Sequence, residues 1–140
     1  MEAITNKNLL VSGAHSLRVL ACGKIFSMGV VHGEAHLLTI DQGIELKAVP
    51  GSVQPTDTAE EGLYHKLIAF RLGQVSRQRT LLLESLTAED LVAIYIDEQG
   101  RNRVAGSLEW PMRFTFSMAG GLYECQLECR GLEATPYLAG

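Results

Sequence analysis

The sequence predicts a mainly β protein, an antiparallel β-barrel or sandwich with one short α-helix at about residues 78–86. Apolar and polar side chains alternate along residues 112–118 and 122–129, on either side of a glycine-rich turn. This pattern is typical of a β-hairpin with one buried face. Roughly eight strand candidates stand against one helix, and an open sheet of that size leaves unpaired edges. Closure into a barrel or packing of two sheets is therefore expected.

Two further hairpins and a covered strand follow from the same reasoning. Residues 91–96 are apolar and β-prone, and Asp-Glu-Gln-Gly separates them from a return strand at 101–106. Residues 36–40 and 44–48 flank Asp-Gln-Gly, which predicts another hairpin. Residues 63–72 carry apolar side chains on both faces, a pattern that favours a central strand covered by other elements.

The predicted helix rests on leucine spacing. Leu82 and Leu83 share a helical face with Leu86, at separations of four and three residues. Leu82 and Leu83 also belong to the run Thr80–Leu83, which would suit a strand as well. The helix is the expected cover for the strand at residues 63–72.

We expect residues 1–140 to form a single β-rich domain, since a chain of this length suits one core. Flexible arms are predicted at about residues 1–8 and 131–140. Residues 52–62 are polar and acidic, so they are predicted to form an exposed loop.

Charge and hydropathy limit the classes of partner. The formal net charge is −4, from 12 Lys and Arg against 16 Asp and Glu. Nucleic-acid binding through a broad basic face is not expected, because such binding depends on Lys and Arg at phosphates. The longest apolar runs have about six residues, far fewer than the roughly 20 of a membrane-spanning helix, so no membrane partner is expected.

The three cysteines, Cys22, Cys125 and Cys129, are predicted to be reduced and buried. Cys125 and Cys129 are four residues apart, which places their Cα atoms roughly 13 Å apart on one strand. A disulfide needs Cα atoms within about 7 Å, so these two cannot pair.

No catalytic, cofactor-binding or metal-binding residues are predicted, and the chain is not expected to be an enzyme or to need a cofactor. The segment His32–His36 has two histidines and Glu34, but its glycine argues against a helix that would present them to a metal. Cys125 with His65 or His32 would form a nucleophile and base only if the fold joined them.

Trp110-Pro111 opens a strand and is read either as packing at the edge of the core or as an interface anchor, where tryptophan is enriched. The acidic residues of the predicted loop, Asp57, Glu60 and Glu61, are expected to be solvated unless a partner binds them. Together with Trp110 and Pro111, they are the predicted interface residues.

Three stretches of sequence carry a resemblance: Gly62–Leu67 after a polar threonine and acid loop, Leu91–Asp97 followed by Gln99-Gly100, and Val104–Phe114. Over roughly residues 56–130 the chain resembles small, uncharacterised prophage structural proteins, of tail or neck type, from Bacteroidales-like bacteria. The resemblance implies a β-barrel or sandwich that assembles into homo-oligomeric rings and contacts other phage structural proteins. It also implies a location in the bacterial cytoplasm during assembly and in the virion afterwards.

Three hypotheses for function remain. The first is a non-enzymatic assembly protein of phage-tail or neck type. The second is a small-molecule or carbohydrate-binding β-barrel that uses Trp110, Tyr95 and Tyr123 as ligand platforms. The third is a hydrolase or metal enzyme, which would need His65, His32 and Cys125 to converge.

Overall fold

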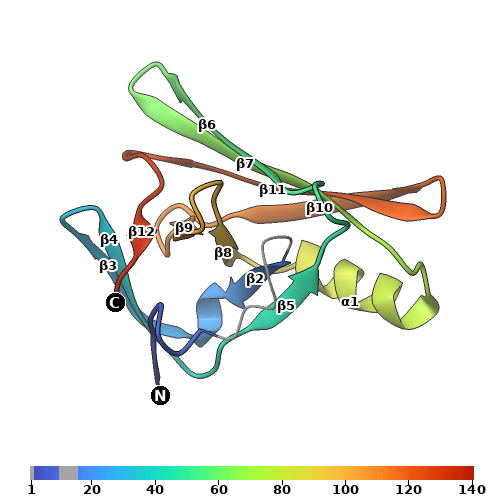
Figure 1. Cartoon of the computed structure of the whole chain (residues 1–140), viewed down its shortest axis with the longest axis horizontal. Coiled ribbons are helices and arrows are strands. Elements are labelled where there is room, and N and C mark those ends of the chain that lie inside the picture. Colours follow the sequence, from blue (N-terminus) through green and yellow to red (C-terminus); the bar gives the residue numbers. More distant parts are fainter. Residues whose placement is uncertain (1, 10–15) are drawn as a thin grey trace.

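The protein has the predicted mainly β architecture, with two sheets and one α-helix in a half-barrel or sandwich (Figure 1). The structure is a computed structural model that describes residues 2–9 and 16–140. The larger sheet contains β1 (Glu2–Ile4), β2 (Ser16–Ala21), β3 (Ile25–Val31), β4 (Glu34–Thr39), β5 (Ile44–Lys47), β8 (Leu91–Ile96), β9 (Asn102–Ala105) and β12 (Tyr137–Leu138). The smaller sheet contains β6 (Gln54–Glu60), β7 (Leu63–Leu72), β10 (Arg113–Ala119) and β11 (Leu122–Gly131).

The two sheets differ in strand direction. The smaller sheet is antiparallel, in the order β10-β11-β7-β6. The larger sheet runs β1-β4-β12-β9-β8-β2-β5, and β3 pairs with the other side of β4. The parallel pairing of β12 with β4 makes it mixed. In Figure 1 the smaller sheet lies across the larger one, with α1 (Arg77–Thr87) at one end.

The hairpins at 91–106 and 112–129 are confirmed. In the second, Ala119 pairs with Leu122, so the turn is the two residues Gly120 and Gly121. Their φ angles are 61° and 77°, as a two-residue hairpin turn of this hand requires. In the first, β8 pairs with β9 from Ile96–Asn102 back to Ala93–Ala105.

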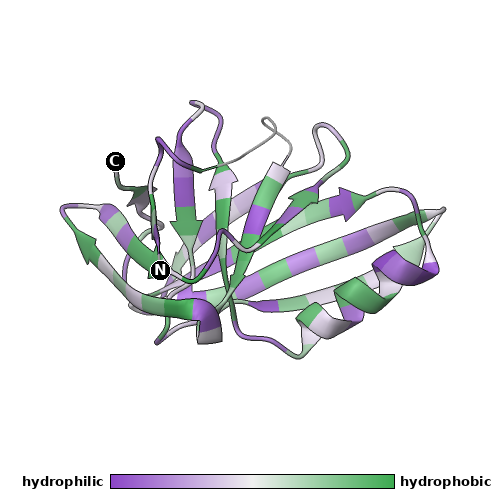
Figure 2. Cartoon of the chain, turned by 90° about the horizontal axis from the view of Figure 1, so that it is seen from below, coloured by the Kyte–Doolittle hydropathy of each residue, from purple (hydrophilic) through white to green (hydrophobic). Residues whose placement is uncertain are grey.

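The main core lies between the sheets and follows from strand alternation. On β11, Tyr123, Cys125 and Leu127 are buried while Glu124 and Gln126 are exposed. Figure 2 shows this alternation as hydrophobic and hydrophilic bands along the strands. β7, β10 and β11 therefore each present buried apolar side chains to the core between the sheets.

A second core explains why β8 is apolar on both faces. Ala93 and Tyr95 face the core between the sheets, whereas Val92 and Ile94 pack in a separate cluster with residues of β1, β3, β4 and β12. The smaller sheet covers one face of β8 and other strands of the larger sheet cover the other, so that strand needs no polar side.

The helix predicted at 78–86 is confirmed as α1. Ser76 is its N-cap, and its hydroxyl oxygen accepts a hydrogen bond from the Arg79 backbone N–H at 3.1 Å. Leu83 and Leu86 are buried in the main core, and Leu81 is exposed. Within the described residues, no helix is long and apolar enough to cross a membrane.

The hairpin predicted from residues 36–40 and 44–48 is wrong. β4 pairs with β3, and β5 pairs with β2. A tighter two-residue turn at His32 and Gly33, with φ of 54° and 76°, joins β3 to β4. Because this connection is short, β4 pairs with β3. β5 is then free to pair with β2 at the other end of the larger sheet.

The loop predicted at residues 52–62 is also wrong, although residues 56–62 are exposed as expected. Residues 54–60 form β6, which pairs with β7 from Gln54–Ala69 to Glu60–Leu63. β6 is an edge strand whose side chains are nearly all exposed, so its polar sequence suits its position. For the same reason the sequence lacks the apolar alternation by which a strand is recognised.

Each predicted arm contains a short strand that pairs with β4, which corrects that expectation for the described residues; Met1 lies outside them. β1 pairs with β4 and buries Ile4. β12 joins β4 to β9 and buries Leu138. Each terminus fills an otherwise open position beside β4, and its few apolar side chains complete the second core.

Gly43 is predicted to be a position where the fold tolerates no side chain. It has φ of +73°, and a Cβ there would lie 2.3 Å from the Val19 carbonyl oxygen. We expect Gly43→Ala to lower the free energy of unfolding by about 3 kcal/mol or more, measured by urea denaturation. Gly51, with φ of +78° and open space around it, is the matched control. Gly51→Ala should cost about 1 kcal/mol, and equal losses would contradict the steric explanation.

Candidate functional site

A compact turn between β9 and β10 holds Trp110 at the surface. The Ser107 hydroxyl oxygen accepts a hydrogen bond from the Trp110 N–H at 3.0 Å, and the Ser107 N–H donates to the Trp110 carbonyl at 3.1 Å. Gly106 begins the turn with φ of +89°, and a Cβ there would lie 2.8 Å from Met112 Cγ. Met112 in turn donates to the Leu91 carbonyl at 2.7 Å. The turn is therefore fixed to β8.

A cavity of about 300 Å³ lies beside this turn. Its walls come from the turn, from residues 28–30 of β3, and from the segment 130–136, which comprises the end of β11 and the link to β12. Four large apolar side chains that line it are substantially exposed: Val30, Leu108, Trp110 and Leu132. We call these four residues the apolar rim. Their gathering from three separate segments is typical of a binding surface rather than of scattered surface residues.

Lys66 is the buried charged residue of this cavity. It lies on β7 with only 7% of its surface exposed, opposite Asp57 on one side and Cys129 on the other. Its side chain crosses the backbone of Gly131, where a Cβ would lie 3.4 Å from its Nζ atom. Among the described residues, the Lys66 ammonium makes no hydrogen bond or ion pair.

Asp57 lies opposite Lys66 but forms no ion pair with it, and its carboxylate accepts hydrogen bonds from another segment. Its two oxygens accept hydrogen bonds from the Thr135 N–H and from the Thr135 hydroxyl, each at 2.9 Å. Thr135 is buried and lies in the chain between Ala134 and Pro136, which both line the cavity. Asp57 thus attaches this wall to the smaller sheet.

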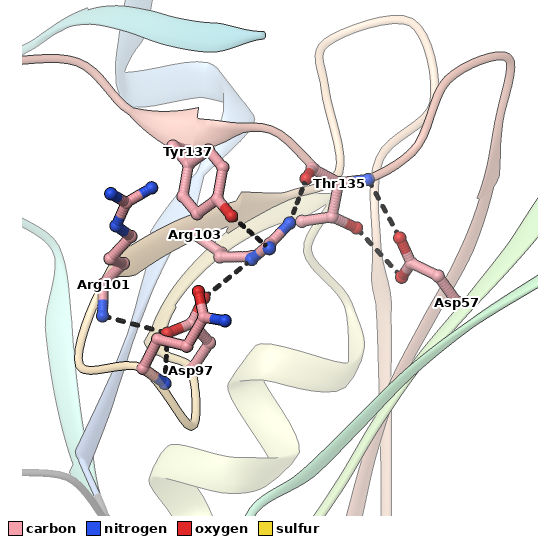
Figure 3. A network of polar contacts seen from close by, with 7 residues as sticks. Asp57, Asp97, Arg101, Arg103, Thr135 and Tyr137 are labelled. Carbon is pink, nitrogen blue, oxygen red and sulfur yellow. Dashed lines mark hydrogen bonds and ion pairs between the residues drawn. The ribbon is translucent and has the colours of Figure 1, made fainter.

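Arg103 on β9 attaches the same wall to the larger sheet (Figure 3). Its guanidinium donates to the Thr135 carbonyl at 2.9 Å, to the Tyr137 hydroxyl at 2.7 Å and to Asp97 at 3.0 Å. It also lies over the Tyr137 ring, 4.1 Å from the centroid. The backbone N–H groups of Gln99 and Arg101 hold the other Asp97 oxygen, each at 2.9 Å. The network fixes residues 135–137 between both sheets.

The network sets the ionisation of its members. Burial alone would raise the pKa of Asp97, but hydrogen bonds from the Arg101 backbone and the Arg103 guanidinium outweigh it and lower that pKa. Burial, reinforced by the charge of Asp57, raises the pKa of the nearby Tyr95 to about 12. Asp97 therefore stays charged and Tyr95 stays neutral at physiological pH.

The other predicted interface residues lie at two places. Pro111 is half-buried within the Trp110 turn, and its peptide bond is trans. Glu60 and Glu61 are exposed at the tip of the β6–β7 hairpin, where Glu61 has φ of 52°. Asp57 is linked to the cavity through Thr135. Their role as interface residues stays a prediction.

The fold separates the candidate nucleophile from its candidate base. Cys125 faces the core, and burial together with the charge of Glu124 raises the pKa of its thiol to about 12. His65 lies on the opposite face of the smaller sheet, where its ring is 2.9 Å from Glu128. The exposed His32 lies in the turn between β3 and β4. These side chains do not form a catalytic pair.

The described chain contains no group of three or more His, Cys, Asp or Glu residues that could hold a metal ion. His32 and Glu34 are exposed at the β3–β4 hairpin, as is His36. All three cysteines are free; Cys125 and Cys129 are buried and Cys22 is half-buried. Burial raises the pKa of Cys129 to about 11, although the charge of Lys66 opposes the rise.

Comparison of the chain with known protein families, with curated proteins and with solved structures found no match. The resemblance to phage structural proteins therefore stays a prediction.

Sequence reasoning identified Trp110 but missed Lys66, Arg103 and Thr135. A signal for Lys66 was present, since it precedes Ile68, Phe70 and Leu72 at the same two-residue period and so shares their inward face. The partners of Arg103 lie up to 34 residues away in the sequence, and nothing local marks them.

Removing the Arg103 side chain should loosen the wall of the cavity. We expect Arg103→Ala to lower the free energy of unfolding by about 2–3 kcal/mol. The substitution removes the guanidinium donor from the Asp97 carboxylate, the Thr135 carbonyl and the Tyr137 hydroxyl. Arg101→Ala is the matched control, since that side chain only lies 5.0 Å from the Tyr137 ring centroid and should cost under about 1 kcal/mol. Urea denaturation measures both, and similar losses would show that the network contributes little.

Asp97 should make stability sensitive to acid. Its pKa is lower in the folded chain than in the unfolded chain, so its contribution is present above the unfolded pKa and is lost as pH falls through the folded value. We expect the melting temperature of the native chain to fall more steeply below about pH 4 than that of Asp97→Asn. Parallel curves for the two proteins would contradict the lowered pKa.

Proposed function

We propose that the chain is a non-enzymatic assembly protein, a tail or neck component of a phage particle that forms a homo-oligomeric ring. In this proposal it is made in the bacterial cytoplasm, assembles there with other phage structural proteins and ends in the virion. The apolar rim is the surface through which it contacts a neighbouring subunit or another component.

The single observation that carries the proposal is the exposure of the apolar rim. Leu132 is 64% exposed, Leu108 42% and Trp110 37%, and all three line one cavity. Exposed apolar groups that gather in one place are stabilised when a partner covers them, and tryptophan is enriched among the residues that dominate binding energy. The rim is also held rigidly, because the Trp110 turn and segment 130–136 are both pinned by hydrogen bonds.

The edges of the smaller sheet support the same proposal. In the described chain, β6 and β10 each pair on one side only, with β7 and β11. Strand edges present unpaired backbone N–H and C=O groups that can pair with another chain. A ring built from β-rich subunits could use such edges alongside the rim.

One observation favours the small-molecule or carbohydrate-binding alternative, the cavity beside Trp110. The other two aromatic residues expected to contact a ligand, Tyr95 and Tyr123, do not line this cavity. Tyr123 is fully buried, and its hydroxyl bonds Ser76 and Thr80 of the α1 region. Tyr95 is buried in the core between the sheets. An interface role for the rim accounts for more of the exposed apolar surface.

Oligomeric state tests the proposal. We expect the native chain to have a mass of several subunits in multi-angle light scattering after size exclusion, and Trp110→Ala to shift the population toward monomer because a central apolar contact is lost. Leu81→Ala is the matched control, since Leu81 is an exposed apolar residue on α1 outside the rim. It should leave the mass unchanged.

A native chain that stays monomeric at high concentration would contradict the ring. Loss of assembly in both variants, or in neither, would contradict the assignment of the interface to the rim. Equal melting temperatures for Trp110→Ala and Leu81→Ala would show that the two substitutions perturb the fold alike.

A further inference from the structure

Lys66 is the feature of the cavity that the apolar rim leaves unexplained. Its side chain is more than nine-tenths buried, lines the cavity and has no anionic partner among the described residues. An interface made only of apolar groups would enclose this ammonium without a counter-charge. Buried charges in proteins are almost always paired, because desolvation without a partner is unfavourable.

No charged residue around the cavity forms an ion pair with Lys66 in the described chain. The carboxylate of Asp57, its cross-strand neighbour, accepts hydrogen bonds from Thr135. The other charged residues that line the cavity are Arg130, Glu109 and Glu133, and all three are exposed. Lys66 is therefore the one buried residue among the charged residues that line the cavity.

We propose that the cavity binds the side-chain carboxylate of an aspartate or glutamate on a partner protein, with the carboxylate at Lys66 and an adjacent apolar side chain against the rim. The inference rests on the proposed function and specifies the chemistry of its partner. The partner supplies the counter-charge that the chain lacks, and the rim covers the flanking apolar group. A charge-assisted hydrogen bond to the ammonium gives the contact its specificity.

The shape of the site favours a protein segment over a free small acid. Small-molecule sites bury most of the surface of their ligand, in cavities of roughly 300–1,000 Å³. This cavity, at about 300 Å³, is at the lower limit, and the residues of its rim are 37–64% exposed. A small acid at Lys66 would leave much of the rim uncovered, whereas a chain that continues across it would cover both.

The site carries its own reporter, because Trp110 is the one tryptophan in the sequence. The probe is the capped peptide acetyl-Leu-Glu-Leu-amide, titrated while Trp110 emission is recorded. Its neutral counterpart, acetyl-Leu-Gln-Leu-amide, and the free acid 4-methylpentanoate are the comparison ligands. We expect a saturable change with the Glu peptide at a concentration on the order of 1 mM, at least tenfold weaker binding of the other two, and weaker binding at high salt.

Lys66→Met tests the role of the ammonium and keeps the apolar stem. We expect at least a tenfold loss of Glu-peptide binding together with an unchanged or higher melting temperature, because an unpaired buried charge is removed. Arg130→Met is the matched control: it removes an exposed cation at the same cavity and should change binding less than threefold. A purely structural role for Lys66 would instead lower the melting temperature.

Three results would overturn the inference. They are equal binding of the Glu and Gln peptides, no saturable binding of the Glu peptide, and unchanged binding in Lys66→Met. Tighter binding of the free acid than of the peptide would overturn the choice of a protein partner. The oligomeric state of the native chain is independent of these titrations, so an assembled chain with no carboxylate preference would leave the proposed function intact.

Discussion

The two-residue alternation of the long strands β7 and β11 is the constraint on which this structure depends. It directs Ile68 and Phe70 into the main core, and the same register places Lys66 inside, where the inward-facing row of β7 begins. Turning Lys66 outward by a one-residue shift would expose the core residues of the whole strand. The fold therefore holds a lysine inside the protein for as long as the main core is intact.

The walls around Lys66 are fixed by a second set of interactions. Asp57 from the smaller sheet and Arg103 from the larger sheet both bind Thr135, so the segment that closes the cavity is attached to both layers. The Trp110 turn is attached to β8 by backbone hydrogen bonds of Met112. A surface assembled from such fixed parts loses little conformational freedom when it binds, which suits a docking function.

Much of the fold could be predicted from local patterns, and the site mostly could not. The hairpin of β10 and β11, strand β7 and helix α1 follow from periodicity and turn residues. β6 and β12 were missed because an exposed edge strand and a short terminal strand carry little apolar alternation. Trp110 could be singled out as a tryptophan before a proline. Its grouping with Val30 and Leu132, and the link between Arg103 and Thr135, depend on how the sheets pack, which no local pattern encodes.

The central claim is that the surface around Trp110 is covered when the chain assembles. The most direct measurement is acrylamide quenching of Trp110 fluorescence over a dilution series, with the mass of the particles recorded in parallel by sedimentation. We expect quenching to be efficient in the dilute subunit and to fall as the mass rises. Unchanged quenching while the mass rises would contradict it, because assembly would then use another surface.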